Sequence, residues 1–267
     1  MPNHSSTPLR CDCHIHVFDR DKSYASSTYQ PPGKGIEAFR AEGMVRGIGR
    51  AVLIQASIDG TDNRYLVETL RAQAGIELRG VAVIDEQTEG LDDLDAAGVR
   101  AIRVQDRTRL GRNDLDRLPV LARRAATMDW HVELNTEPAR YGRLQALMAS
   151  LPADQPLVLD HLGHVSPHDI EHLAGLSRLL DTGRVWVKLA PTRVSQSPDR
   201  YDDLAQLIHH LAGRYPERCL WGSDWPHVMT APPLPSSSAM IGFLERELTS
   251  AQFEACFSSN PAALYRF

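Results

Sequence analysis

The chain has 267 residues, which is enough for one large α/β domain with a substantial buried core. Apolar residues make up 42% and charged residues 24%, as in ordinary soluble globular proteins, and the net charge of −5 argues against nucleic acid or acidic membranes as partners. No run approaches the roughly 20 apolar residues of a membrane span. The polar residues 1–8 lack a signal-peptide pattern, and we expect them to be flexible. Four cysteines are too few for a disulfide scaffold, so we expect reduced thiols in a cytoplasmic protein.

Strand-like runs alternate with segments of helical periodicity along the whole chain. The predicted strands cover residues 9–18, 50–56, 78–84, 99–104, 130–134, 157–159, 185–189 and 219–222. The predicted helices cover residues 63–74, 89–97, 115–128, 139–151, 169–182, 201–215 and 239–247. The first connection, residues 19–49, differs from the others and reads as a long loop followed by a short helix.

This alternation predicts one fold class, a single (β/α)8 TIM barrel that occupies residues 1–267. The alternative is a doubly wound open sheet. That fold would need a glycine-rich phosphate-binding turn after an early strand, and the sequence has none. In a barrel the catalytic groups gather at the C-terminal ends of the strands, so we expect the active site there.

The first predicted strand carries an Asp-x-His-x-His pattern formed by Asp12, His14 and His16. Because alternate side chains of a strand share a face, we expect these three on one side. Cys11 and Cys13 should then point the other way, into the layer between strands and helices. Two imidazoles and a carboxylate on one face suit a metal, or an anion that is to be bound and polarised.

Two later strand ends complete the pattern. The sixth predicted strand ends in Asp160-His161-Leu162-Gly163-His164, and the eighth ends in Trp221-Gly222-Ser223-Asp224-Trp225-Pro226-His227. Strand ends so far apart in the chain meet when the strands lie side by side and parallel, as they do in a barrel. The three motifs together therefore predict one site.

With these residues placed, the chain resembles the amidohydrolase superfamily, and within it the lactone-acting branch typified by the 2-pyrone-4,6-dicarboxylate lactonases. The resemblance covers nearly the full length. It implies a hydrolase that opens the ring of a carboxylated lactone in the catabolism of aromatic compounds or sugar acids. Alternatives on the same scaffold are a lactone isomerase, a metal-dependent decarboxylase, or a barrel that binds a small acid without converting it. The matching stretches are residues 12–16, 55–63, 80–85, 101–103, 160–163, 221–227 and 260–265.

Opening a lactone requires a base that activates water and positive character near the developing oxyanion. Asp224 is our candidate for the base, which would later return the proton to the leaving oxygen. His14, His16 and His161 are candidates for polarising the carbonyl. His227, shortly after Asp224, is expected to orient Trp225 or the base, and it is also a candidate for substrate binding.

Recognition of a carboxylate favours the forked donors of arginine. The resemblance aligns Arg103 and Arg109 with substrate-binding arginines of the family. Arg193, after the seventh strand, is a further candidate, and Ser57 and Tyr29 offer hydroxyl groups. Lys188 also stands at a strand end, where we expect it to pair with a nearby acid and leave it out of the site.

The chain departs from the dicarboxylate lactonases at two positions. They have a tyrosine where this chain has Asn135, and an arginine where it has His164. Both positions are associated in the family with holding substrate carboxylates. We therefore expect Asn135 and His164 to bind substrate in a different way, and the exact lactone to differ.

The resemblance also bears on metal. The fourth strand ends in Arg103 and not in the lysine that, when carboxylated, bridges two metals, so a binuclear site is not expected. The branch is known for working without an obligatory metal. A single divalent ion such as zinc, held by His14, His16, His161 and Asp224, stays open as an alternative. Barrel enzymes often form homo-oligomers, but nothing in the sequence identifies an interface.

Overall fold

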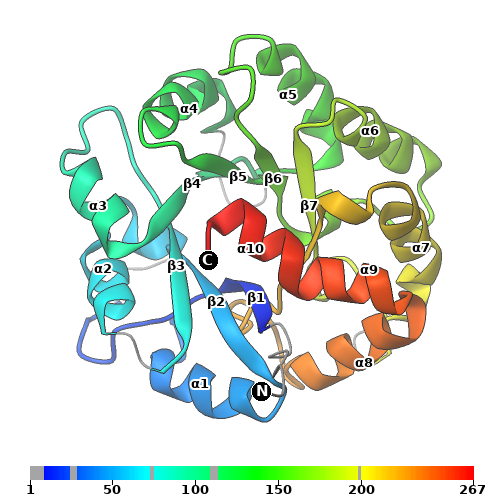
Figure 1. Cartoon of the computed structure of the whole chain (residues 1–267), viewed down its shortest axis with the longest axis horizontal. Coiled ribbons are helices and arrows are strands. Elements are labelled where there is room, and N and C mark those ends of the chain that lie inside the picture. The colour runs from blue at the N-terminus through cyan, green and yellow to red at the C-terminus, as the bar shows by residue number, and fades with distance from the viewer. Residues whose placement is uncertain (1–8, 25–28, 73–74, 109–113, 198–199) are drawn as a thin grey trace, which may run out of the picture.

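The computed structural model describes residues 9–24, 29–72, 75–108, 114–197 and 200–267. Its strands are all parallel, and each pairs with the next one along the chain from β1 to β8. Helices surround this sheet (Figure 1), so the predicted β/α barrel is confirmed. Two expectations, the flexibility of residues 1–8 and the role of Arg109, fall outside the described residues. The strands are β1 (Arg10–Ile15), β2 (Ile48–Ile54), β3 (Glu77–Ala82), β4 (Val99–Gln105), β5 (His131–Asn135), β6 (Leu157–Leu159), β7 (Val185–Leu189) and β8 (Cys219–Trp221).

The helices follow the predicted order, with α1 in the long first connection. After residue 247 the sequence predicts no further helix, whereas the structure adds α9 and α10. Among the described residues, no helix is both long and apolar enough to cross a membrane. The helices are α1 (Ile36–Met44), α2 (Arg64–Arg71), α3 (Leu91–Ala97), α4 (Leu118–Ala126), α5 (Tyr141–Met148), α6 (Ile170–Leu180), α7 (Ala205–Arg214), α8 (Ser237–Glu247), α9 (Ser250–Glu254) and α10 (Asn260–Tyr265).

Two apolar layers hold the barrel together. The larger lies between the strands and the surrounding helices. The smaller lies inside the barrel and joins Val52, Val81 and Leu220 to Tyr265 of α10. Helix α10 crosses one end of the barrel (Figure 1), and Arg79, in the first half of β3, donates to carbonyls at its end. The C-terminal helix therefore closes the end of the barrel opposite the C-terminal strand ends.

Cys11 and Cys13 belong to this inner layer, which corrects the sequence-based expectation. Both side chains are buried and pack with residues of the barrel interior, and their sulfur atoms lie 3.7 Å apart. The prediction that they point into the layer between strands and helices is wrong. They remain free thiols, as expected.

A local irregularity in β1 separates the side chain of Asp12 from those of His14 and His16. The register of β1 against β2 shifts between Asp12 and Ile15, so the strict alternation of sides is broken there. The Oδ1 of Asp12 accepts hydrogen bonds from the backbone N–H groups of His14 and Ser223. The expectation that Asp12 shares a functional face with His14 and His16 is therefore wrong, and Asp12 instead joins β1 to the segment after β8.

That junction is where the barrel closes. The N–H of Asp224 donates to the carbonyl of His14 at 2.9 Å, and the N–H of His16 donates to the carbonyl of Trp225 at 2.8 Å. Gly222 allows this close approach, because a Cβ at this position would lie 2.6 Å from the Cβ of His14. Closure of the barrel thus places Asp224 beside the two histidines of β1.

Candidate active site

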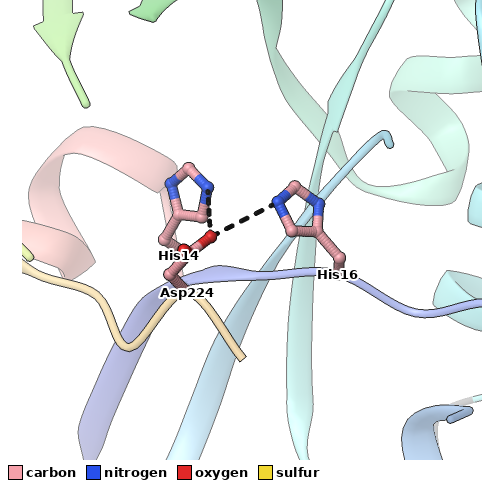
Figure 2. Close-up of side chains that lie close together, drawn as sticks. All are labelled: His14, His16 and Asp224. Atoms are coloured by element: carbon pink, nitrogen blue, oxygen red, sulfur yellow. Dashed lines mark ion pairs between the residues drawn. The ribbon is translucent and has the colours of Figure 1, made fainter. Parts of the chain in front are cut away.

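His14 and His16 both face Asp224 (Figure 2). The Nε2 atom of each histidine lies 3.8 Å from the Oδ1 atom of Asp224, and all three side chains are buried. The backbone of Asp224 has a φ of 63°, a left-handed conformation that costs a non-glycine residue energy and is found preferentially at functional sites. The strand end therefore presents one carboxylate oxygen to two imidazoles.

Arg193 holds the other oxygen of Asp224. It ends the short helix η6 (Pro191–Arg193) after β7, and its Nε lies 2.6 Å from the Oδ2 of Asp224. The same guanidinium donates to the carbonyl of Val228 and to the hydroxyl of Thr230. Burial alone would raise the pKa of Asp224, but the positive charge of Arg193 is the largest effect that opposes it, and this pKa is lowered. Asp224 is thus a carboxylate at neutral pH.

His16 and His161 are uncharged near neutral pH because they are buried. Burial lowers the pKa of His16 to about 3 and brings the pKa of His161 well below its ordinary value. The Nδ1 of His16 lies 2.8 Å from the carbonyl oxygen of Ile54, an acceptor, so Nδ1 carries the proton and Nε2 has a free lone pair. The ring of His161 lies 4.9 Å from that of His14, centroid to centroid. His16 and His161 can therefore offer hydrogen bonds but no positive charge.

Behind the histidines, charged side chains fill the barrel interior. The fully buried Nζ of Lys188 contacts Glu133, and it lies 3.2 Å both from the Oδ1 of Asp160 and from the Nδ1 of His14. The Oδ2 of Asp160 lies 3.4 Å from the Nη2 of Arg103. Two cations and two carboxylates thus balance in this cluster. Lys188 does pair with nearby acids, as expected, but it also reaches a predicted site residue.

Those two acids keep Lys188 charged. Burial alone would lower its pKa, but Asp160 and Glu133 more than offset this effect, so the pKa of Lys188 is raised. In turn, burial would raise the pKa of Asp160, but Lys188 outweighs it, so the pKa of Asp160 is lowered. At neutral pH the cluster is therefore a set of ion pairs.

A pocket opens beside Asp224 at the C-terminal ends of the strands. Most of the predicted site residues line it, and they come from the first connection and from the ends of β1, β2, β4, β5, β6, β7 and β8. His14 and His227 are buried and do not line it. The pocket also includes Gln105, Val228 and Met229, which the sequence analysis does not propose. The predicted residues in its lining are His16, Tyr29, Ser57, Arg103, Asn135, His161, His164, Arg193 and Asp224.

The two positions that depart from the dicarboxylate lactonases bond to each other. The Nε2 of His164 lies 2.8 Å from the Oδ1 of Asn135. Because the amide oxygen accepts, His164 is the donor. Gln105 stands opposite Asn135 in the register of β4 and β5, and within the described part of the chain its buried Oε1 has no hydrogen-bond partner. This wall of the pocket is a set of hydrogen-bonding groups with one free acceptor.

Two groups of buried side chains among the described residues offer ligand atoms for a metal: His14, His16 and Asp224 form one, and His14, Asp160 and His161 form the other. The ligating atoms of His14, His16 and Asp224 lie within 4.8 Å of one another. His16 fits such a role, because a carbonyl at its Nδ1 leaves Nε2 unprotonated. His14 does not fit. The ammonium group of Lys188 and the Oδ1 of Asp160 both lie 3.2 Å from its Nδ1, but only the contact with Lys188 has hydrogen-bond geometry, so Nδ1 is the acceptor and Nε2 carries the proton. As arranged in this structure, the donor set does not match a metal bound through both histidines.

Comparison with known proteins adds a family assignment. A model of the amidohydrolase family matches residues 11–267. The chain is 27% identical to a protein of Comamonas testosteroni named 2-pyrone-4,6-dicarbaxylate hydrolase, over 95% of this chain and 89% of that one. It is 31% identical to a 4-sulfomuconolactone hydrolase of Rhizobium radiobacter, over 81% of this chain and 75% of that one. A solved structure from Pseudomonas putida, described as a 2-pyrone-4,6-dicarboxylic acid hydrolase, superposes with a TM-score of 0.82 at 28% identity and covers 97% of this chain and 98% of its own.

Proposed function

Because the chain belongs to the amidohydrolase family, we propose that it is a hydrolase that opens the lactone ring of a small carboxylated molecule. The observation that carries the proposal is the placement of Asp224. One of its oxygens faces His14 and His16, and a pocket containing Arg103 opens beside it. Two relatives are named as hydrolases, which agrees with this reaction, whereas a third is named a D-galactarolactone isomerase.

The chemistry follows from the roles proposed for these residues. Asp224 takes a proton from a water molecule while the water oxygen bonds to the lactone carbonyl carbon, and N–H groups of His14 and His161 stabilise the oxyanion. When the ring C–O bond breaks, Asp224 returns the proton to the leaving oxygen. The products are a carboxylate and a free hydroxyl group, and the solution gains a proton. His161 is the third imidazole of the site. His227, buried next to the end of β8, is proposed to orient the neighbouring groups.

Arg103 is proposed to bind a carboxylate that the reaction leaves unchanged, with Arg109 as its partner. One part of its guanidinium pairs with Asp160, and the side chain reaches the pocket. Ser57 and Tyr29 supply hydroxyl groups from two further segments of the lining. Arg193 is already bonded to Asp224. We therefore propose that it contacts substrate only with the part of its guanidinium group that does not bind Asp224.

We propose that the reaction needs no divalent metal. The support is the mismatch at His14 and the arginine at the end of β4. A metal that did bind would be held by His14, His16, His161 and Asp224. Activity should therefore survive exhaustive treatment with a chelator, with metal content measured on the same sample. Loss of activity on chelation and its return with zinc or manganese would contradict the proposal.

A pH-indicator assay across a panel of lactones tests the function. Hydrolysis acidifies the solution, whereas an isomerase would change the ring without acidification and a decarboxylase would release carbon dioxide. Asp224→Asn keeps the shape of the side chain but removes the base, so turnover should fall by roughly 10²–10⁴-fold with little change in substrate binding. Glu245→Gln, on the outer surface of α8, is the control and should keep wild-type turnover. No acidification with any lactone would contradict the function, and an active Asp224→Asn protein would remove Asp224 from the mechanism.

We also place the enzyme in the cytoplasm. The support is that all four cysteines are buried free thiols. The sulfur atoms of Cys11 and Cys13 lie 3.7 Å apart and are still not joined by a disulfide, as is usual in a reducing compartment.

A further inference from the structure

Lys188 makes a contact that the proposed mechanism does not use. It lies on β7 in the barrel interior, and its Nζ is 3.2 Å from the Nδ1 of His14. An ammonium group has three hydrogens to donate and no lone pair. A hydrogen bond between the two therefore requires a lone pair on Nδ1.

Asp160 competes for the same nitrogen. Its Oδ1 also lies 3.2 Å from the Nδ1 of His14, so distance alone does not decide between the two partners. The hydrogen-bond angles decide between them. Within the described residues this Oδ1 makes no hydrogen bond of acceptable geometry, whereas the contact between Lys188 and Nδ1 has such a geometry. Lys188 is thus the hydrogen-bond partner of Nδ1.

The contact with Lys188 decides where the ring proton of His14 lies. A nitrogen that accepts a hydrogen bond from an ammonium group cannot itself carry a proton. With Nδ1 as an acceptor, the one proton of His14 is on Nε2, the atom that faces Asp224.

Within the lactone-opening site proposed above, we propose that Lys188 is a positioning residue that fixes His14 as the Nε2–H tautomer, opposite to the Nδ1–H tautomer of His16. The two histidines of β1 then present different groups to the same space beside Asp224. His14 offers a hydrogen-bond donor and His16 offers a lone pair.

This difference divides the work between the two rings. The donor of His14 suits the carbonyl oxygen that becomes an oxyanion. The lone pair of His16 suits a hydrogen of the attacking water, next to the carboxylate that removes the proton. A metal ligand must present an unprotonated nitrogen, so Lys188 also works against metal binding at His14.

Tautomers are measured directly in the wild-type protein by long-range ¹H–¹⁵N NMR of histidine-labelled samples, with His14→Gln and His16→Gln spectra for assignment. We expect an Nε2–H signature for His14 and an Nδ1–H signature for His16. The same Nδ1–H form in both rings would overturn the proposal. The spectra need no substrate, so their result stands whether or not the protein hydrolyses a lactone.

A charge-balanced pair of substitutions tests the role of Lys188 itself. Lys188→Met with Glu133→Gln removes one charge of each sign and leaves Asp160 paired with Arg103. The Nδ1 of His14 then has Asp160 as its neighbour and should take the proton, which frees Nε2. Glu133→Gln alone is the control, because it keeps Lys188 and should keep the wild-type tautomer.

Zinc binding gives a second measurement that a purely structural role would not change. By titration calorimetry with Zn²⁺, the double variant should bind at least about tenfold more tightly than the Glu133→Gln control, since a carboxylate behind a histidine favours metal ligation. Its turnover of a lactone without metal should fall more than its KM changes. An unchanged His14 tautomer in the folded double variant, or zinc affinity equal to the control, would overturn the proposal. If the variant does not fold, the wild-type spectra still decide the tautomers.

Discussion

Arg193 and Asp224 form an ion pair that leaves one carboxylate oxygen free for chemistry. The Nε of Arg193 lies 2.6 Å from Oδ2, whereas Oδ1 faces His14 and His16 at 3.8 Å. The pair fixes the orientation of the carboxylate, and the positive charge keeps it ionised. A base held in this way is always available, but it is weaker than a free carboxylate.

Removing that positive charge should change the pH dependence of catalysis. Arg193 lowers the pKa of Asp224, so in Arg193→Met this pKa rises and the carboxylate is lost at a higher pH as the solution is acidified. The acid limb of kcat/KM should therefore move to higher pH, by roughly one to three units. Arg193→Lys keeps the charge and should stay nearer the wild type. Identical acid limbs in the wild type and Arg193→Met would show that this pair does not tune the base.

The architecture follows from local patterns, which is why the sequence predicts it. Each strand, and each helix up to α8, has a recognisable pattern in the sequence, whereas α9 and α10 are not predicted. The polar groups at the ends of β1, β6 and β8 then meet in any parallel barrel. The sequence therefore predicts that His14, His16, His161 and Asp224 lie close together. Their roles remain proposals.

The relationships that are missed depend on distant contacts. The irregularity of β1 accompanies a bond between Asp12 and the backbone of Ser223, 211 residues later, and no local pattern reveals it. The partners of Lys188 come from β1, from β5 and from the end of β6. Gln105 could have been found, because it follows Arg103 by two residues on the same strand and so shares its face.

Arg103 is expected to determine the preference for carboxylated substrates. Arg103→Ala removes a buried forked donor, which should cost about 2–5 kcal/mol of binding for a carboxylated lactone and raise its KM steeply. A neutral lactone of the same ring size, assayed on the same protein, is the control for damage caused by the loss of the Asp160 contact. Equal losses on the two substrates would mean that Arg103 supports the fold and not recognition.

Asp12 should make stability depend on pH in the direction opposite to a salt-bridged acid. Burial raises the pKa of Asp12 to about 6, above its value of about 3.9 in the unfolded chain. Between these values the folded state holds a proton that the unfolded state has lost, so this residue makes the free energy of unfolding fall as pH rises from about 4 to about 6.

Asp12→Asn removes this titration and keeps an oxygen for the N–H groups of His14 and Ser223. Relative to the wild type, the free energy of unfolding of the variant should increase with pH over that interval, by up to about 3 kcal/mol, and then level off. Urea denaturation at several pH values measures the difference, and every other titrating group is common to both proteins. A difference that does not vary with pH would contradict a raised pKa for Asp12.

The contact between Asn135 and His164 should set which lactone is preferred. In wild type these side chains bond to each other, and the free acceptor of Gln105 stands beside them. This wall suits a hydroxyl group better than a second carboxylate. We expect a monocarboxylate or hydroxylated lactone to be used at least as well as 2-pyrone-4,6-dicarboxylate.

Changing both residues to those of the dicarboxylate lactonases should reverse that preference. Asn135→Tyr with His164→Arg adds a permanently charged fork, which should raise the ratio of kcat/KM for the dicarboxylate over a monocarboxylate by about tenfold or more. His164→Gln keeps a neutral donor opposite Asn135 and should leave the ratio near that of wild type. Gln105→Leu should instead lower kcat/KM for hydroxylated lactones alone, because it removes the free acceptor. If the double variant gains nothing on the dicarboxylate, the second carboxylate is bound elsewhere in the pocket and this wall does not determine the substrate.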